Sequence, residues 1–323
     1  MVDPELVDCL IVGAGPGGLV AATYLTRFHR RIEVIDAGAS RARWIPQTHN
    51  CPGFPFGVSG SDLLAKLRTQ AEGYGAPITP ARICALERDR VGFVARDEQG
   101  RAHHARFVVL ATGIVDRMPA FEGGPEALEE AIGAGAIRLC AVCDGYEASD
   151  ERIAVYGPAD EAIRHAVFLR TFSRRVAVIL SEPGAPSQEC SALARAAGVE
   201  VLPVARALEF RDGGACAVEL DGAEPGRCFD TVYPVLGGAA QSQLAAALGA
   251  RVNEAGELVV DAKQQTSVDG LYAIGDVVSG LNQISVAMGH AAVAASAIHQ
   301  RLPPNFREDE ASQPETAADL PSP

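Results

Sequence analysis

Two cysteines spaced as a redox dithiol stand near the middle of the chain, in Cys140-Ala141-Val142-Cys143. At this spacing one thiolate can be stabilised by its neighbouring sulfur and by a helix end. Asp144 follows directly and could act as the general acid–base that protonates a leaving thiolate. The alternative is half of a structural zinc site, which needs a second ligand pair, and the sequence contains no other Cys-x-x-Cys. The pattern favours thiol–disulfide chemistry.

A glycine-rich turn near the start of the chain has the form Gly-x-Gly-x-x-Gly. It follows an apolar run at 6–12, which predicts a buried parallel strand, and it opens a predicted helix. Gly13 allows the tight turn, Gly15 lets the backbone approach a pyrophosphate, and Gly18 lets helix and strand pack closely. Asp36 ends the next predicted strand, where a ribose-binding acid belongs. Together these residues predict a dinucleotide site.

Two further motifs follow predicted strands, Ala111-Thr112-Gly113 and Gly275-Asp276. Asp276 could accept hydrogen bonds from the hydroxyls of an extended ribityl chain. It also precedes a helix whose N-terminus could stabilise negative charge on a reduced flavin. Taken alone, Asp276 is more typical of a turn or cap residue.

The elements that must position these residues follow two βαβ patterns. We expect strands at 32–35, 153–156, 176–180 and 271–274, helices at 61–73, from 157 to about 172 and from about 285 to 300, and antiparallel strands within 82–110 that turn at Gln99-Gly100. The prediction is an α/β fold with two Rossmann-like dinucleotide-binding domains, the central one inserted into the other.

With these motifs the sequence resembles the low-molecular-weight thioredoxin reductases and their relatives among the two-dinucleotide-domain flavoproteins. The resemblance covers residues 6–302, and its most specific part is Cys-x-x-Cys-Asp-Gly at 140–145. The other matching stretches are Gly13-Ala14-Gly15-Pro16-Gly17-Gly18, Pro52-Gly53-Phe54-Pro55 with Gly60 and Leu63-Leu64, Ala111-Thr112-Gly113, and Tyr272-Ala273-Ile274-Gly275-Asp276 with Gln283.

The resemblance implies a homodimer with an FAD-binding domain at 1–118 and 248–302, and a central domain at 119–247 that carries the dithiol and normally binds NADPH. It implies that Cys143 is the sulfur on the flavin side and that Cys140 attacks the partner disulfide. The FAD-binding residues that it implies are Gly13, Gly15, Pro16, Gly18, Asp36, Ala111, Thr112, Gly113, Gly275, Asp276, Gln283 and Ile284.

The second nucleotide turn departs from the family pattern Gly-Gly-Gly-Asn-x-Ala and reads Gly157-Pro158-Ala159-Asp160-Glu161-Ala162. Ala159 carries a Cβ where a pyrophosphate would lie, and Pro158 lacks an N–H. After Leu180 the family's basic cluster for a 2′-phosphate is replaced by Ser181-Glu182-Pro183-Gly184. NADPH is therefore a doubtful cofactor. Another nucleotide, a second FAD or an empty site are the alternatives for this domain.

Composition limits the partners. The net charge of −13 over 323 residues argues against nucleic acid or an anionic membrane surface as a partner. No apolar run reaches the ~18–20 residues of a membrane span, and the start lacks the basic segment of a secretory signal. We therefore expect a cytoplasmic protein without a bound metal. Residues 303–323, rich in acidic residues and proline, predict a disordered tail.

The function expected is that of an FAD-dependent thioredoxin reductase-like disulfide oxidoreductase. It would pass electrons between the flavin, the Cys140–Cys143 pair, and a thioredoxin-like protein or another small disulfide. The donor would be a ferredoxin or flavodoxin. One alternative is an O₂-dependent dithiol oxidase, although relatives of that kind often carry His where this chain has Asp144. The other is a non-catalytic flavin-binding redox sensor.

Overall fold

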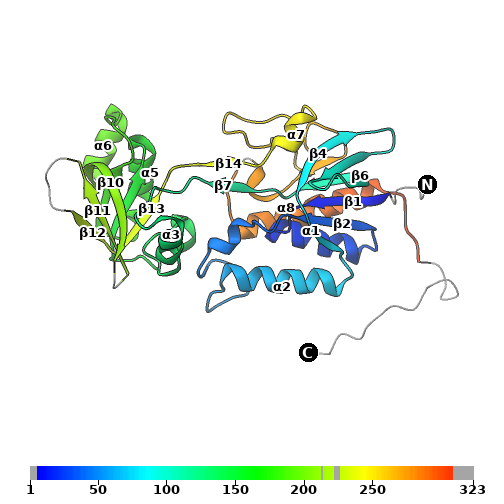
Figure 1. Cartoon of the computed structure of the whole chain (residues 1–323), viewed down its shortest axis with the longest axis horizontal. Helices are drawn as coiled ribbons and strands as arrows, with labels where there is room; N and C mark the ends of the chain where they lie inside the picture. The colour runs from blue at the N-terminus through cyan, green and yellow to red at the C-terminus, as the bar shows by residue number, and fades with distance from the viewer. Residues whose placement is uncertain (1–5, 212–213, 222–225, 279, 308–323) are drawn as a thin grey trace. The chain divides into compact units, whose positions relative to one another are not determined.

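A computed structural model of the chain describes residues 6–211, 214–221, 226–278 and 280–307 (Figure 1). The chain forms two compact units. The first comprises Met1–Arg41, Leu63–Ile114 and Ala240–Pro323, and the second comprises Ala42–Asp62 and Val115–Ala239. The first unit is therefore discontinuous in sequence, and the dithiol lies in the second.

The first unit is built on a seven-stranded sheet of order β3-β2-β1-β6-β5-β4, with β15 also paired to β6. Its strands are β1 (Val7–Val12), β2 (Ile32–Asp36), β3 (Ile78–Pro80), β4 (Ile83–Arg88), β5 (Phe93–Asp97), β6 (Ala102–Leu110) and β15 (Leu271–Ala273). β1 pairs in parallel with β2 and β6, and β6 pairs in parallel with β15. Val12 is level with Leu110, and Leu110 with Ala273, so three parallel strands end at one edge.

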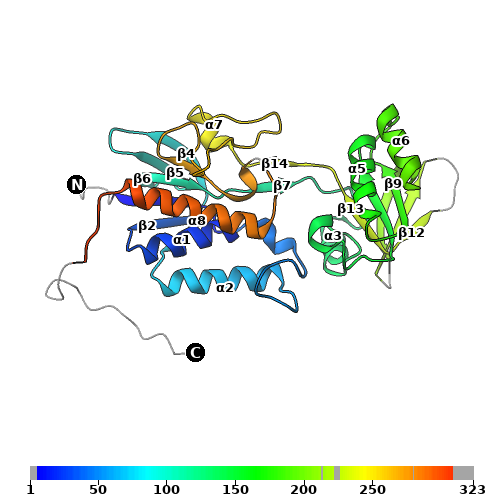
Figure 2. The same cartoon turned by 180° about the vertical axis from the view of Figure 1, so that it is seen from behind.

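Successive residues of β1 point to opposite faces of the sheet, so the sheet has two apolar faces, and helices cover both. Cys9 and Ile11 join the core on the side of α1 and α8, and Leu10 and Val12 join the core that contains Ala245 of α7. Figures 1 and 2 show α1 and α8 side by side. The helices and 3-10 turns are α1 (Pro16–Arg27), η1 (Arg41–Trp44), α2 (Gly60–Gly73), α7 (Gln243–Ala247), η2 (Gly275–Val277) and α8 (Ile284–Arg301).

The end of α8 is tied to the end of α1 by a buried arginine. Arg30 donates from Nε to Nδ1 of His299 and from Nη1 to the carbonyl of Pro303, each at 2.9 Å. The side-chain amide of Asn305 donates to the carbonyl of Phe28 at 2.8 Å. The prediction therefore placed the start of the disordered tail too early, because residues 303 and 305 are hydrogen-bonded to this unit. Its remainder, 308–323, lies outside the described residues.

The second unit has a six-stranded sheet of order β12-β11-β10-β9-β8-β13. Strands β13, β8, β9 and the start of β10 are parallel, and β10, β11 and β12 are antiparallel. The elements are α3 (Gly124–Gly133), α4 (Ala141–Asp144), β8 (Arg152–Gly157), α5 (Ala159–Leu169), β9 (Arg175–Leu180), α6 (Gln188–Ala197), β10 (Glu200–Arg211), β11 (Ala215–Leu220), β12 (Arg227–Phe229) and β13 (Thr231–Pro234). Strands β7 (Ile114–Asp116) and β14 (Gly238–Ala240) pair where the chain passes between the units.

The predicted α/β fold with two Rossmann-like units is confirmed, including the turn at Gln99-Gly100 between β5 and β6. The unit boundaries differ from the expected 118/119 and 247/248. The chain returns to the first unit at Ala240, because Ala245 of α7 is buried in that unit's core. Within the described residues, no helix has the length and apolar character needed to cross a membrane.

Candidate active site

Cys140 and Cys143 are joined in a disulfide, with their Cα atoms 5.3 Å apart. Cys140 is extended and immediately precedes the one-turn helix α4. Its carbonyl accepts hydrogen bonds from the amides of Cys143 at 3.0 Å and Asp144 at 3.3 Å. This single turn brings the two sulfurs within bonding distance. In the part of the chain that the structure describes, no three His, Cys, Asp or Glu side chains group as a metal site would require.

The half-buried carboxyl of Asp144 lies beside the hydroxyl of Tyr233. That hydroxyl donates to Oδ1 at 2.9 Å. Burial raises the pKa of Asp144 to about 6, against the opposing effects of the Tyr233 hydrogen bond and the positive charge of Arg138. The nearby carboxylates of Glu147 and Glu151 add to the rise. A carboxyl that titrates near neutral pH can both give and take a proton there, as an acid–base in thiol chemistry must.

Arg138 fixes the main chain at the same position. Its Nη1 donates to the carbonyl of Asp144 at 3.2 Å, and its Nη2 lies 3.6 Å from Oε1 of Glu151. The other oxygen of Glu151 is buried without a hydrogen-bond partner, and burial raises the pKa of this glutamate. On the other flank, the side-chain amide of Asn50 donates to the carbonyl of Val142 at 3.3 Å. Sequence reasoning assigned no role to Arg138 or Tyr233.

In the first unit, the predicted cofactor residues gather at the edge where β1, β6 and β15 end. A Cβ on Gly13 would lie 2.4 Å from the carbonyl oxygen of Ala111, and one on Gly18 would lie 1.9 Å from the carbonyl oxygen of Gly13. Both positions therefore require glycine for the fold itself. Gly15 differs, because among the described residues a Cβ there would meet only Oγ of Ser40, at 3.4 Å. The space over Gly15 is open to a ligand.

Asp36 ends β2 and holds the glycine-rich turn. Its Oδ1 accepts a hydrogen bond from the amide of Ala14 at 3.0 Å, and its Oδ2 lies 3.5 Å from Nη2 of Arg68. A carboxylate has about four acceptor positions, so Asp36 keeps capacity for the hydroxyls of a ribose. The position predicted for a ribose-binding acid thus also has a structural role.

Asp276, in η2, forms an ion pair with Arg41 of η1, with Nη1 and Oδ2 3.2 Å apart. Sequence reasoning missed Arg41, which lies 235 residues away along the chain and belongs to no recognised motif. A guanidinium at this place matters because arginine binds phosphate with two parallel hydrogen bonds. The ion pair therefore places a positive and a negative group just beyond the end of β15.

The remaining predicted cofactor residues lie around this edge. The hydroxyl of Thr112 donates to the carbonyl of Gln241 at 2.7 Å, and the carbonyl of Gly113 accepts from the amide of Gln241 at 2.9 Å. Gln283 is the N-cap residue of α8 and Ile284 its first residue. One turn later, Ala287 comes within 3.4 Å of where a Cβ on Gly275 would lie. The structure therefore brings these sequence-distant residues into one region.

The second nucleotide turn, between β8 and α5, differs from the turn before α1 because acidic residues follow it. Pro158 is the N-cap residue of α5, and Asp160 and Glu161 lie in the first turn of that helix. The carboxylate of Asp160 accepts a hydrogen bond from the amide of Ser187, at the start of α6, at 2.8 Å. Hydrogen bonds from Ser187 keep the pKa of Asp160 low, so it is ionised at neutral pH. By contrast, the first turn of α1 contains no acidic residue.

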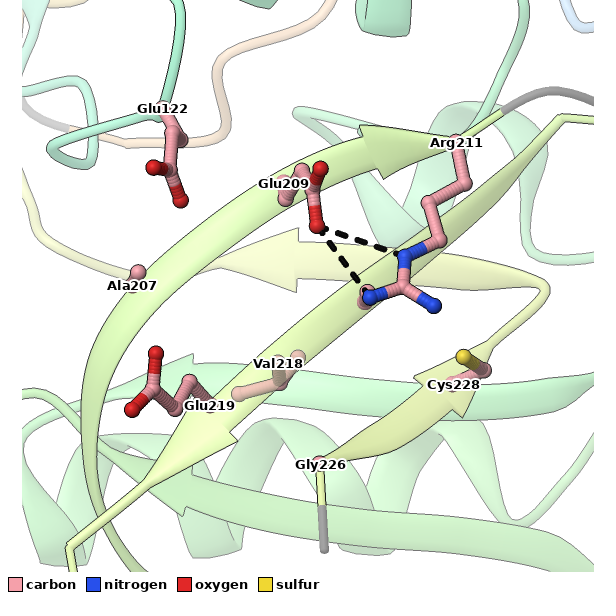
Figure 3. A pocket seen from close by; sticks show the side chains of 9 residues that line it. Glu122, Ala207, Glu209, Arg211, Val218, Glu219, Gly226 and Cys228 are labelled. Carbon is pink, nitrogen blue, oxygen red and sulfur yellow. Dashed lines mark hydrogen bonds and ion pairs between the residues drawn. The ribbon is translucent and has the colours of Figure 1, made fainter.

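A pocket of about 200 Å³ in the second unit lies on strands β10, β11 and β12 (Figure 3). Glu122, Glu209 and Glu219 line it, together with Arg211 and Cys228. Nε of Arg211 lies 3.3 Å from Oε2 of Glu209. Figure 3 shows this pair within the pocket lining. Neither redox cysteine lines this pocket, so it is separate from the dithiol.

The sequence profile of the pyridine nucleotide-disulphide oxidoreductases matches residues 7–291. The chain belongs to this family. A thioredoxin reductase of Aquifex aeolicus is 30% identical over 307 residues, which cover 92% of this chain and 93% of that protein. Among solved structures, HlmI is 29% identical with a TM-score of 0.83, over 92% of this chain and 94% of that chain. A thioredoxin reductase of Streptococcus pyogenes, 24% identical with a TM-score of 0.82 over 92% and 98% of the two chains, supports the fold.

This oxidoreductase is thus a thioredoxin reductase-like, FAD-dependent enzyme that acts on a sulfur group, with a disulfide redox centre. The residues present fit FAD. The space over Gly15 is open, the N-terminus of α1 has no acidic residue to repel a pyrophosphate, and Asp36 and Arg41 supply an acceptor and a cation nearby.

Proposed function

We propose that the protein uses the Cys140–Cys143 pair to reduce either the disulfide of a thioredoxin-like protein or another small disulfide. The observation that carries the proposal is this disulfide with a carboxyl of pKa about 6 on the very next residue, Asp144. Similarity to a thioredoxin reductase over 92% of the chain supports the partner class.

The exchange conserves electrons and protons within the two reacting pairs. The Cys140 thiolate attacks one sulfur of the partner disulfide, which breaks that bond and releases the first partner thiol. Cys143 then attacks the Cys140 sulfur of the mixed disulfide, re-forms the internal disulfide and releases the second partner thiol. The dithiol loses two electrons and two protons, and the partner gains both.

Asp144 is the proton acceptor and donor in this scheme. At neutral pH a carboxyl of pKa about 6 is largely ionised and can take the proton of the Cys143 thiol as that sulfur attacks. When the internal disulfide is reduced, the protonated form can return it. Its place directly after Cys143 in the chain supports this assignment.

FAD, when bound, supplies the two-electron oxidation and reduction of the dithiol. The N-terminus of α1 and the guanidinium of Arg41 would stabilise the negative charge of its pyrophosphate. Asp36 would accept from the hydroxyls of its adenosine ribose, and Asp276 would orient Arg41 through their ion pair. Gln283 and Ile284 would meet the isoalloxazine at the start of α8.

The electron donor in this proposal is a ferredoxin or flavodoxin rather than NADPH. Pro158 offers no amide to a pyrophosphate, and the ionised Asp160 would repel one at the start of α5. No basic residue occurs in the segment 181–184 that follows β9, where a 2′-phosphate would need one. A nucleotide without that phosphate, or a second FAD, is the alternative occupant of this unit.

Anaerobic stopped-flow measurements on the purified flavoprotein test the proposal. Reduced ferredoxin or flavodoxin should reduce the flavin and then a thioredoxin disulfide, whereas millimolar NADPH or NADH should act more slowly than turnover. Reduction by NADPH within the turnover time would contradict the donor assignment. Oxygen uptake driven by a dithiol, without reduction of any disulfide, would indicate a dithiol oxidase. Failure of every donor and acceptor would indicate a redox sensor.

Three simpler measurements accompany this test. Extraction of bound nucleotide should give one FAD per chain, and two would place a second flavin in the unit that contains α5. Light scattering should find the homodimer that the resemblance to thioredoxin reductases suggests, and cell fractionation should find the cytoplasmic location expected from the sequence. A monomer, or a membrane-associated pool, would overturn the corresponding part of the proposal.

A further inference from the structure

A buried tyrosine reaches the acid–base residue from a strand far along the chain. Tyr233 lies on β13, and its side chain is 2% exposed. Its ring packs in a core cluster with Val155 of β8 and Ala141 of α4, and Tyr233 is level with Val155 in the parallel pair β8–β13. The sheet and the core therefore fix where the hydroxyl points.

The hydroxyl touches Asp144 at two oxygens. It lies 2.9 Å from Oδ1 of the carboxyl and 3.4 Å from the main-chain carbonyl oxygen of the same residue. Burial, together with the carboxylate of Asp144, raises the pKa of Tyr233. The tyrosine thus keeps its proton at any physiological pH and is a permanent donor to the carboxyl.

We propose that Tyr233 is a positioning residue, whose hydroxyl holds the Asp144 carboxyl in the orientation that serves Cys143. The inference rests on the role proposed for Asp144 above. The charged groups around Asp144 are Arg138, whose Nη1 binds its carbonyl, and the carboxylates of Glu147 and Glu151. These act on the main chain or at a distance, whereas Tyr233 binds a carboxyl oxygen directly.

The test is the pH dependence of a single exchange between the pre-reduced holoenzyme and a thioredoxin disulfide, without external donor. Tyr233→Phe removes one oxygen and keeps the ring. We expect a roughly ten-fold slower exchange at neutral pH and a titration midpoint shifted to higher pH, because the ionised carboxylate loses a donor. Asp144→Asn should be slowed at least about 100-fold and should lose the titration.

Two controls separate positioning from general damage. Tyr156→Phe makes the same change on β8 of the same unit, at a partly buried tyrosine, and should keep the wild-type rate and midpoint. In the Asp144→Asn background, Tyr233→Phe should add no further loss, because the group that it positions is gone. Site-specific 3-fluorotyrosine at position 233, a stronger donor, should move the midpoint the opposite way and serves if the phenylalanine variant does not fold.

The outcomes distinguish the two levels of the argument. A wild-type rate and midpoint in Tyr233→Phe, with the expected defect in Asp144→Asn, overturns the inference and leaves the proposed function intact. An additive loss in the double variant also overturns it. A wild-type pH profile in Asp144→Asn, or no exchange by the wild-type dithiol, contradicts the proposed function itself.

Discussion

Adding one methyl group to the glycine-rich turn should have opposite consequences at two positions three residues apart. Gly15→Ala should leave the protein folded and remove most of its flavin. Gly18→Ala should destabilise the protein whether or not flavin is bound. The difference follows from what each new Cβ would contact in the first unit.

At position 18 the new Cβ would lie 1.9 Å from the backbone oxygen of Gly13, so the helix must move away from the strand. Such overpacking costs about 1–3 kcal/mol, or roughly 2–12 °C in melting temperature for a unit of this size. At position 15 the nearest atom is Oγ of Ser40 at 3.4 Å. A serine hydroxyl can rotate away, and the backbone at Gly15 has φ −70°, which any residue adopts.

The methyl group of Gly15→Ala instead occupies the space left for a pyrophosphate. If the ligand must shift at a similar overpacking cost of about 1–3 kcal/mol, FAD affinity should fall by about 5- to 150-fold. The assay is flavin content after gel filtration, with titration of added FAD, and thermal melting of both apoproteins. An apo Gly15→Ala protein that melts well below the wild-type apoprotein would refute the reasoning. So would a Gly15→Ala protein with full flavin affinity.

Three further predictions concern the two sites. Because burial in the folded state raises the pKa of Asp144 from an ordinary 3.8 to about 6, the stability of wild type relative to Asp144→Asn should be greatest below pH about 4. It should fall by at most about 3 kcal/mol as pH rises through 6, and melting temperatures across this range would show it. Cys143→Ser should trap a thioredoxin partner as a mixed disulfide through Cys140, detected by mass spectrometry, whereas Cys140→Ser should trap none. Arg41→Ala should weaken FAD binding by about 10-fold, the value of one charge-assisted hydrogen bond, while Arg43→Ala, next but one in the chain, should not. Equal flavin affinity in both arginine variants would remove Arg41 from the site.

The sequence was sufficient where neighbouring residues determine the conformation. The apolar run ending at Val12, the turn from Gly13 to Gly18 and the acid at Asp36 are contiguous signals, and each element formed where the pattern predicted it. The cysteine pair was equally predictable from the sequence, because a single helical turn between Cys140 and Cys143 is enough to bring the sulfurs together.

The sequence was insufficient where a contact depends on which strands become neighbours. Tyr233 meets Asp144 across 89 residues because β13 pairs with β8, and Arg41 meets Asp276 across 235 residues. Neither pair belongs to a local motif, and a tyrosine or arginine has many possible partners. The same applies to Arg30, whose hydrogen bond to Pro303 attaches a residue that composition alone assigns to a tail.

The pairing of β6 with β15, and of α1 with α8, also has a consequence for how the protein is made. On the ribosome, β1 and α1 emerge early, but Ala22 of α1 shares its buried cluster with Ala291 and Ala294, which are synthesised near the end. The unit that carries the dithiol lies almost entirely between these segments and can complete its own sheet first. The proposed flavin site, by contrast, includes Asp276 and the start of α8. If this site holds the flavin as proposed, acquisition of flavin would report that translation has passed α8, and a chain truncated before α8 would carry its cysteines without the cofactor.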